Sequence, residues 1–123
     1  AAPLSAGTGA RTMEDFVERI THWFPEMEID TVPDSVLQSY WERHSVINMV
    51  ENLPAEDLQA VRWYIDCGDD DFLLQRNALV NIALHEREIP HEFRARDGGH
   101  TWTYWRESLP EVLRFVSDAF HLY

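Results

Sequence analysis

The sequence predicts an α/β fold with about three parallel strands and crossover helices, and three observations carry this prediction. Residues 61–67 (V-R-W-Y-I-D-C) are rich in β-branched and aromatic side chains and stop at Gly68, as a strand does. Residues 91–96 alternate polar and apolar side chains, which indicates a second strand. Helical patterns over 72–88 and 103–120 make the order strand, helix, strand, helix, which is typical of a parallel sheet.

The first half of the chain adds one short strand and several helices. Residues 1–6 resemble a buried strand, which we expect to be the third strand of the sheet. Thr12 is a predicted N-cap for a helix that ends before Pro25, because acidic residues follow it in the first turn. Residues 35–52 predict one or two helices, since the apolar spacing is interrupted near Ser45.

Composition and charge exclude several classes of function. The chain has 123 residues, 45% of them hydrophobic, which is enough for one domain with a core. Its net charge is -12 and its ten basic residues are all arginine, so it lacks the basic surface that nucleic acids require. The absence of lysine excludes Schiff-base and P-loop chemistry on this chain. No apolar run approaches the roughly 18 residues of a membrane span.

Two titratable side chains follow the two clearest strands. Asp71 comes just after the strand over 61–67, and His100 comes just after the strand over 91–96. Functional residues of parallel sheets gather at the carboxyl ends of strands, so adjacent strands bring these two turns together. An aspartate followed by a histidine matches the last two members of a Ser–Asp–His triad in chain order. In such a triad the carboxylate fixes the imidazole tautomer, and the free ring nitrogen takes the proton of a serine.

The residues around Asp71 and His100 resemble the C-terminal part of one family of α/β-hydrolases. The motifs that carry the resemblance are C-G-D-D-D-F-L at 67–73 and D-G-G-H-T-W-T-Y-W at 97–105. The family contains esterase D, tributyrin-type esterases, feruloyl and acetyl xylan esterases and the mycolyltransferases. The resemblance implies an α/β-hydrolase fold and a carboxylic-ester hydrolase (serine esterase) with Asp71 as the triad acid and His100 as the base. It implies no cofactor and no metal.

The same resemblance implies that residues 1–123 are a single C-terminal segment of a hydrolase domain. The family nucleophile lies in G-x-S-x-G, upstream of the strand that residues 1–6 resemble, and none of the five glycines here frames a serine in that way. We therefore expect the nucleophile-bearing N-terminal half to be absent and the segment to be inactive alone. Residues 12–60 stand where such hydrolases carry a helical insert or cap-like region, whose aromatic side chains would form either a lid or a plain core.

Each predicted site residue also has a simpler interpretation. His100 could be a solvated turn histidine or a helix cap, and Asp71 could be an ordinary N-cap. Trp102, two residues past the base, could bind substrate by lining its pocket or could only pack. Asp69 and Asp70 are typical of solvated turn residues. The run of three carboxylates at 69–71 lacks the spaced oxygen ligands of a calcium loop, so it predicts no metal site.

Two functions from different classes follow from these observations. The first is a serine esterase segment that acts on small-molecule or carbohydrate-linked esters. The alternative is a non-catalytic α/β module for binding or assembly, since an unpaired strand edge recruits partners. The expected partner is then the missing N-terminal half or a second copy, paired through residues 1–6.

Overall fold

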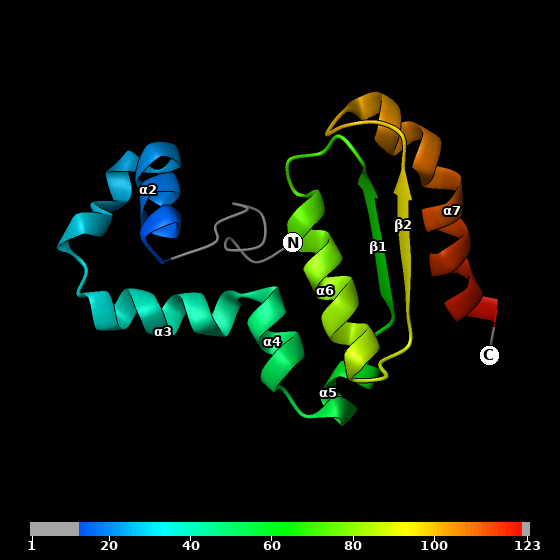
Figure 1. Ribbon diagram of the computed structural model, residues 1–123, viewed down its shortest axis with the longest axis horizontal. Helices are drawn as coiled ribbons and strands as arrows, with labels where there is room; N and C mark the ends of the chain where they lie inside the picture. The colour runs from blue at the N-terminus through cyan, green and yellow to red at the C-terminus, as the bar shows by residue number, and fades with distance from the viewer. Residues whose placement is uncertain (1–12, 122–123) are drawn as a thin grey trace. The chain divides into compact units, whose positions relative to one another are not determined.

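The computed structural model describes residues 13–121 and divides the chain into two compact units, with the boundary after Pro54 (Figure 1). The first, called the helical unit below, has only helical secondary structure among its described residues. The second, called the sheet unit, begins at Ala55 and contains the strands. Among residues 13–121, no helix combines the length and the apolar composition needed to cross a membrane.

The helical unit forms because its apolar side chains recur at helical spacing. It comprises α2 (Met13–Trp23), the short 3-10 turns η1 (Pro25–Met27) and η2 (Ile29–Thr31), α3 (Asp34–His44) and α4 (Val46–Asn52). Phe16 and Ile20 of α2 are buried against Ile29 and Leu37, and these four side chains form the core of the unit. Partly buried aromatic residues pack around that core: Phe24, Tyr40 and Trp41.

The sequence predicted most of this unit correctly. The helix expected to end before Pro25 is α2, while its predicted cap, Thr12, lies outside the described residues. Residues 35–52 form two helices rather than one. Ser45 separates them, because its hydroxyl oxygen accepts a hydrogen bond from the Asn48 N–H at 3.4 Å and caps α4.

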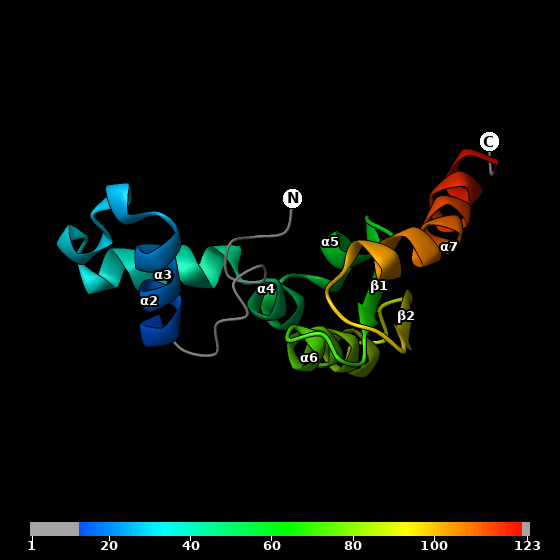
Figure 2. The same cartoon turned by 90° about the horizontal axis from the view of Figure 1, so that it is seen from above.

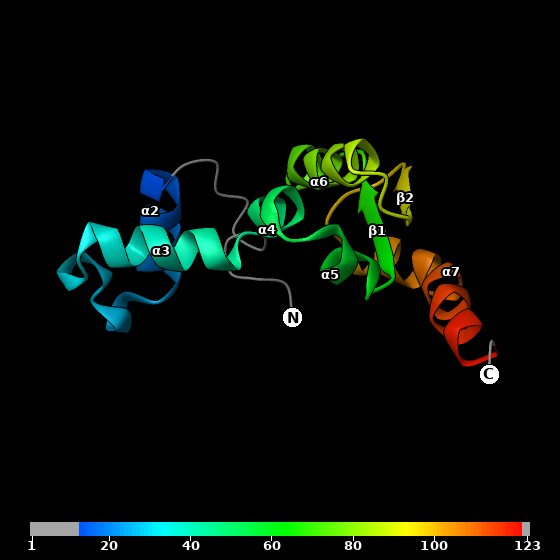
Figure 3. The ribbon, with the colours of Figure 1, turned by 90° about the horizontal axis from the view of Figure 1, so that it is seen from below.

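The sheet unit alternates helices and strands. In chain order it consists of α5 (Ala55–Gln59), β1 (Trp63–Gly68), α6 (Leu74–Glu86), β2 (His91–Arg96) and α7 (Trp102–His121). The strands run parallel, with Trp63 opposite His91 and Gly68 opposite Arg96. Figure 2 and Figure 3 show α6 and α7 on opposite faces of this sheet. The α/β prediction is confirmed for two parallel strands; the third predicted strand, residues 1–6, lies outside the described residues.

Strand β1 differs from its prediction at both ends. It begins at Trp63 rather than at Val61, and it includes Gly68, which was predicted to stop it. Arg62 lies outside the strand and donates a hydrogen bond to the Phe115 carbonyl of α7. Gly68 stays in the strand because its backbone continues the parallel pairing with β2.

Candidate active site

Two turns meet at the carboxyl end of the sheet, one after β1 and one after β2. The Asp69 N–H donates to the Arg96 carbonyl, and the Asp70 N–H donates to the Gly98 carbonyl, each at 2.8 Å. The Gly98 N–H donates in turn to Asp69 Oδ1 at 3.1 Å. Three hydrogen bonds therefore fasten the turns that carry the predicted acid and the predicted base.

The close approach of the turns requires glycine at position 68. A Cβ there would lie 2.2 Å from the Gly98 carbonyl oxygen, a backbone atom that cannot rotate away. We expect Gly68→Ala to lower the free energy of unfolding by about 2 kcal/mol, as overpacking does. Gly99→Ala is the matched control, since a Cβ there would come no closer than 3.9 Å to the Asp70 carbonyl. Urea unfolding compares the two variants, and equal unfolding midpoints would rule out the close approach.

The structure brings Asp71 and His100 into contact. His100 Nδ1 lies 3.0 Å from Asp71 Oδ2, and the Asp71 side chain is 6% exposed while that of His100 is 44% exposed. The other oxygen of Asp71, Oδ1, accepts a hydrogen bond from the Leu73 N–H at 2.8 Å. Asp71 therefore holds the turn before α6 and the imidazole at the same time, with a separate oxygen for each.

The contact determines which nitrogen of His100 is available for chemistry. An ionised carboxylate only accepts hydrogen bonds, so the contact predicts that Nδ1 carries the proton and donates to Asp71. Among residues 13–121, Nε2 has no hydrogen-bond partner. A neutral imidazole in this tautomer keeps a lone pair on Nε2 and can act as a general base.

Two aromatic rings contact the imidazole of His100. The Phe72 ring centroid lies 5.1 Å from that of His100, and the Trp105 ring lies 4.8 Å away in an edge-on arrangement. Trp102, the predicted substrate contact, is 75% exposed and packs edge-on against Trp105 at 5.1 Å. The sequence analysis singled out Trp102, whereas the aromatic rings in contact with His100 are those of Phe72 and Trp105.

A buried carboxylate beneath the turns was missed by the sequence analysis. Asp66, in the middle of β1, has a side chain that is 8% exposed. Its Oδ2 accepts hydrogen bonds from the Tyr64 hydroxyl at 2.9 Å and from Arg96 at 3.1 Å, and its Oδ1 accepts one from the Tyr104 hydroxyl. The available signal was a lone acidic residue inside the apolar run of the strand, where a charge needs partners.

The hydrogen bond from Tyr104 to Asp66 predicts that the protein loses stability at alkaline pH. Burial, the hydrogen bond to Asp66 and the charge of Asp66 raise the pKa of Tyr104 to about 12. Between pH 10 and 12 the unfolded chain releases this proton while the folded chain keeps it, so the free energy of unfolding falls as the pH rises, by about 2 to 3 kcal/mol. Chemical denaturation across this range measures the fall, and the absence of lysine keeps other titrations few.

Tyr104→Phe is the control for this prediction. The variant should lose most of the alkaline fall in stability, because phenylalanine has no proton to release. Tyr64, whose pKa burial also raises, remains in the variant and accounts for the residual slope. An unchanged slope in Tyr104→Phe would show that the hydroxyl is not held as described.

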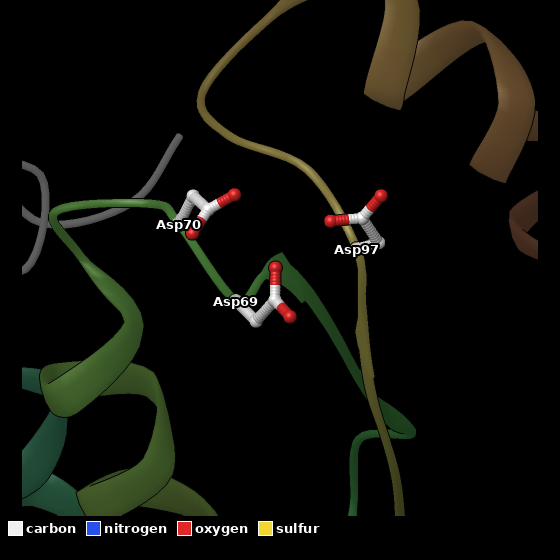
Figure 4. Close-up of side chains that lie close together, drawn as sticks. All are labelled: Asp69, Asp70 and Asp97. Atoms are coloured by element: carbon white, nitrogen blue, oxygen red, sulfur yellow. The ribbon is translucent and has the colours of Figure 1, made fainter.

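Three exposed carboxylates surround the outer side of the turns (Figure 4). Asp69 and Asp70 follow β1 and Asp97 follows β2, and one oxygen from each lies within 4.8 Å of the others. Asp69 already accepts the Gly98 N–H. All three side chains are exposed to solvent, and exposed acidic groups commonly gather in this way without a cation.

Comparison with known proteins identifies relatives with a named activity. No protein-family model matches the chain. An acetyl esterase of Caldicellulosiruptor saccharolyticus is 29% identical over 71 residues, which cover 58% of this chain and 27% of that protein. A solved structure of a ferulic acid esterase is similar with a TM-score of 0.57 and 43% identity over 65% of this chain. The chain is a relative of α/β-hydrolase esterases. The resemblance predicted from the sequence is thereby confirmed.

This α/β-hydrolase relative is short beside the proteins it matches. It spans 27% of the acetyl esterase and 31% of the ferulic acid esterase. Both relatives are named as esterases, one for acetyl esters and one for ferulic acid.

Proposed function

We propose that this chain supplies the acid and the base of a Ser–Asp–His triad to a carboxylic-ester hydrolase that extends beyond these 123 residues. The observation that carries the proposal is the 3.0 Å contact between His100 Nδ1 and the buried Asp71 carboxylate, with Nε2 left available. The esterase names of the two relatives support the same reaction class. We assign Asp71 as the triad acid and His100 as the base.

The proposed reaction proceeds through an acyl-enzyme. His100 Nε2 takes the proton of the serine hydroxyl as that oxygen attacks the ester carbonyl, and it then delivers the proton to the leaving alcohol. Water, activated by the same nitrogen, releases the acid and regenerates the serine. Asp71 keeps the proton on Nδ1 throughout and stabilises the imidazolium that forms in each half-reaction.

We assign the nucleophile and the oxyanion hole to residues outside this chain. None of its five glycines frames a serine in G-x-S-x-G, the turn that exposes the serine of α/β-hydrolases. The short coverage of both relatives supports a missing N-terminal half. The segment alone then has negligible esterase activity, since covalent catalysis needs the serine.

The proposed substrates are small-molecule or carbohydrate-linked esters. The relatives' names support acetyl and feruloyl acyl groups, which are both uncharged. Phe72 and Trp105 place apolar rings beside the base, and the exposed Trp102 extends this surface. We propose that Trp102 contacts the substrate. We also propose that residues 12–60, which comprise the described helical unit and α5 of the sheet unit, form the cap-like insert.

A serine-directed probe tests the proposal. In the extended esterase, defined as this chain together with the upstream residues encoded before Ala1, a fluorophosphonate should label one serine and abolish hydrolysis of short acyl esters. We expect peptide mapping to place the label upstream of residue 1. A label on a serine within residues 1–123, or full activity of the labelled protein, would refute the assignment.

The exposed apolar face of α7 fits both candidate functions, the esterase segment and the assembly module. Its large apolar side chains recur at helical spacing and are about half exposed or more: Leu109, Leu113, Val116 and Phe120. Such a face indicates a protein contact. We propose that the missing half of the hydrolase covers it; a second copy is the partner if no serine elbow exists upstream.

A further inference from the structure

Tyr104 lies directly behind the turn that carries His100. A Cβ added to Gly98 would lie 2.8 Å from Tyr104 Cδ2, so the tyrosine ring fills the space beside this glycine. Gly98 has a φ of 134°, which other residues rarely adopt, and the Tyr104 side chain is buried. The ring therefore limits how far the Gly98 backbone can retreat from the turn after β1.

The far end of Tyr104 is anchored in the sheet. Its hydroxyl donates to Asp66 Oδ1, while Tyr64 and Arg96 hold the other oxygen of the same carboxylate. Asp66 belongs to β1 and Arg96 to β2, so both strands fix the position of the acceptor. A tyrosine bonded to such an acceptor cannot shift along the sheet without breaking a buried charge-assisted hydrogen bond.

Helix α7 also joins Tyr104 to the base through its first turn. The Tyr104 N–H donates to the hydroxyl oxygen of Thr101 at 3.3 Å, and Thr101 is the neighbour of His100. Tyr104 therefore contacts the chain on both sides of His100: its ring lies against Gly98, and its N–H is bonded to Thr101. Either connection would transmit a displacement of Tyr104 to the imidazole.

We propose that Tyr104, held by Asp66, is a positioning residue for the triad: it keeps the Gly98 turn against the Asp69–Asp70 turn so that His100 meets Asp71. The inference rests on the proposed function, because the position of His100 matters only if it acts as the base. Tyr104 contacts neither the substrate nor a reacting atom in this role.

Amide hydrogen exchange on the 123-residue chain tests the positioning without any assay of activity. The Asp70 N–H, bonded to the Gly98 carbonyl, reports whether the two turns stay together. We expect Tyr104→Phe to speed its exchange about tenfold beyond the change in global opening, since one buried hydrogen bond to a charged group is lost.

Tyr64→Phe is the matched control. It removes the same kind of hydrogen bond from the same carboxylate, but Tyr64 belongs to β1 and no described contact joins it to the Gly98 turn. In Tyr64→Phe, the exchange rate of the Asp70 N–H should then change only as much as the global opening of the protein does. Equal effects of the two variants, or no effect of Tyr104→Phe, would overturn the proposal.

Kinetics of the extended esterase provide the second measurement. Tyr104→Phe should lower kcat about tenfold with KM nearly unchanged, because misplacing the base affects the transition state more than substrate binding. A change in KM alone would contradict positioning. If the extended protein hydrolyses no ester, the proposed function fails, and the exchange experiment still decides whether Tyr104 holds the turns together.

Discussion

Replacing His100 with alanine in the extended esterase is expected to lower kcat for short acyl esters by about five to six orders of magnitude. The serine then lacks the group that accepts its proton, and loss of the base in a comparable triad removes nearly all covalent catalysis. KM should change far less, because His100 donates nothing to the bound ester in its ground state. Steady-state hydrolysis of acetyl and feruloyl esters measures both constants.

His85→Ala is the matched control for this experiment. His85 is an exposed histidine near the end of α6, so its loss removes the same side chain away from the two turns. We expect kcat to stay within about twofold of the wild-type value, as for most surface substitutions. Wild-type kcat in His100→Ala would exclude His100 as the base.

Asp71→Asn in the extended esterase should lower kcat by about four orders of magnitude, as the corresponding change does in a serine protease triad. The amide can still accept the Leu73 N–H through its carbonyl oxygen, so the turn before α6 is preserved. Its NH₂ group then faces His100 Nδ1, which must accept rather than donate. The ring proton moves to Nε2, and the nitrogen that should take the serine proton is blocked.

Asp70→Asn separates the role of Asp71 from a general loss of charge. Asp70 is the exposed neighbour of Asp71 and belongs to the same turn, so the two variants remove the same charge from almost the same place. We expect Asp70→Asn to keep nearly all activity. If both variants lose activity equally, the turn needs negative charge rather than a specific contact with His100.

The arrangement of Asp71 and His100 could be predicted because it depends on topology alone. Two strand patterns, each followed by a turn with one titratable residue, place both side chains at one edge of a parallel sheet. The strands that follow from those patterns are β1 and β2, and the parallel register brings the turns together. The boundaries of β1 were shifted, because strand ends depend on contacts such as that of Arg62 with the Phe115 carbonyl, and the two helices begin and end one or two residues from their predicted bounds.

The network around Asp66 could not be predicted, because its members come from different elements. Tyr64 and Asp66 belong to β1, Arg96 to β2 and Tyr104 to α7, so no periodic pattern in the sequence connects them. The ring contacts of Phe72 and Trp105 with His100 were also missed, because these residues too come from different parts of the chain. Side-chain directions at the start of α7 decide which of its tryptophans touches the imidazole.

Nitrogen-15 NMR of the His100 ring in the 123-residue chain tests the pairing with Asp71 most directly. At a pH where the imidazole is neutral, we predict a protonated Nδ1 and an unprotonated Nε2, and we predict that Asp71→Asn moves the proton to Nε2. A wild-type ring that carries its proton on Nε2, or a ring unchanged by Asp71→Asn, would contradict the assignment of these two residues as acid and base.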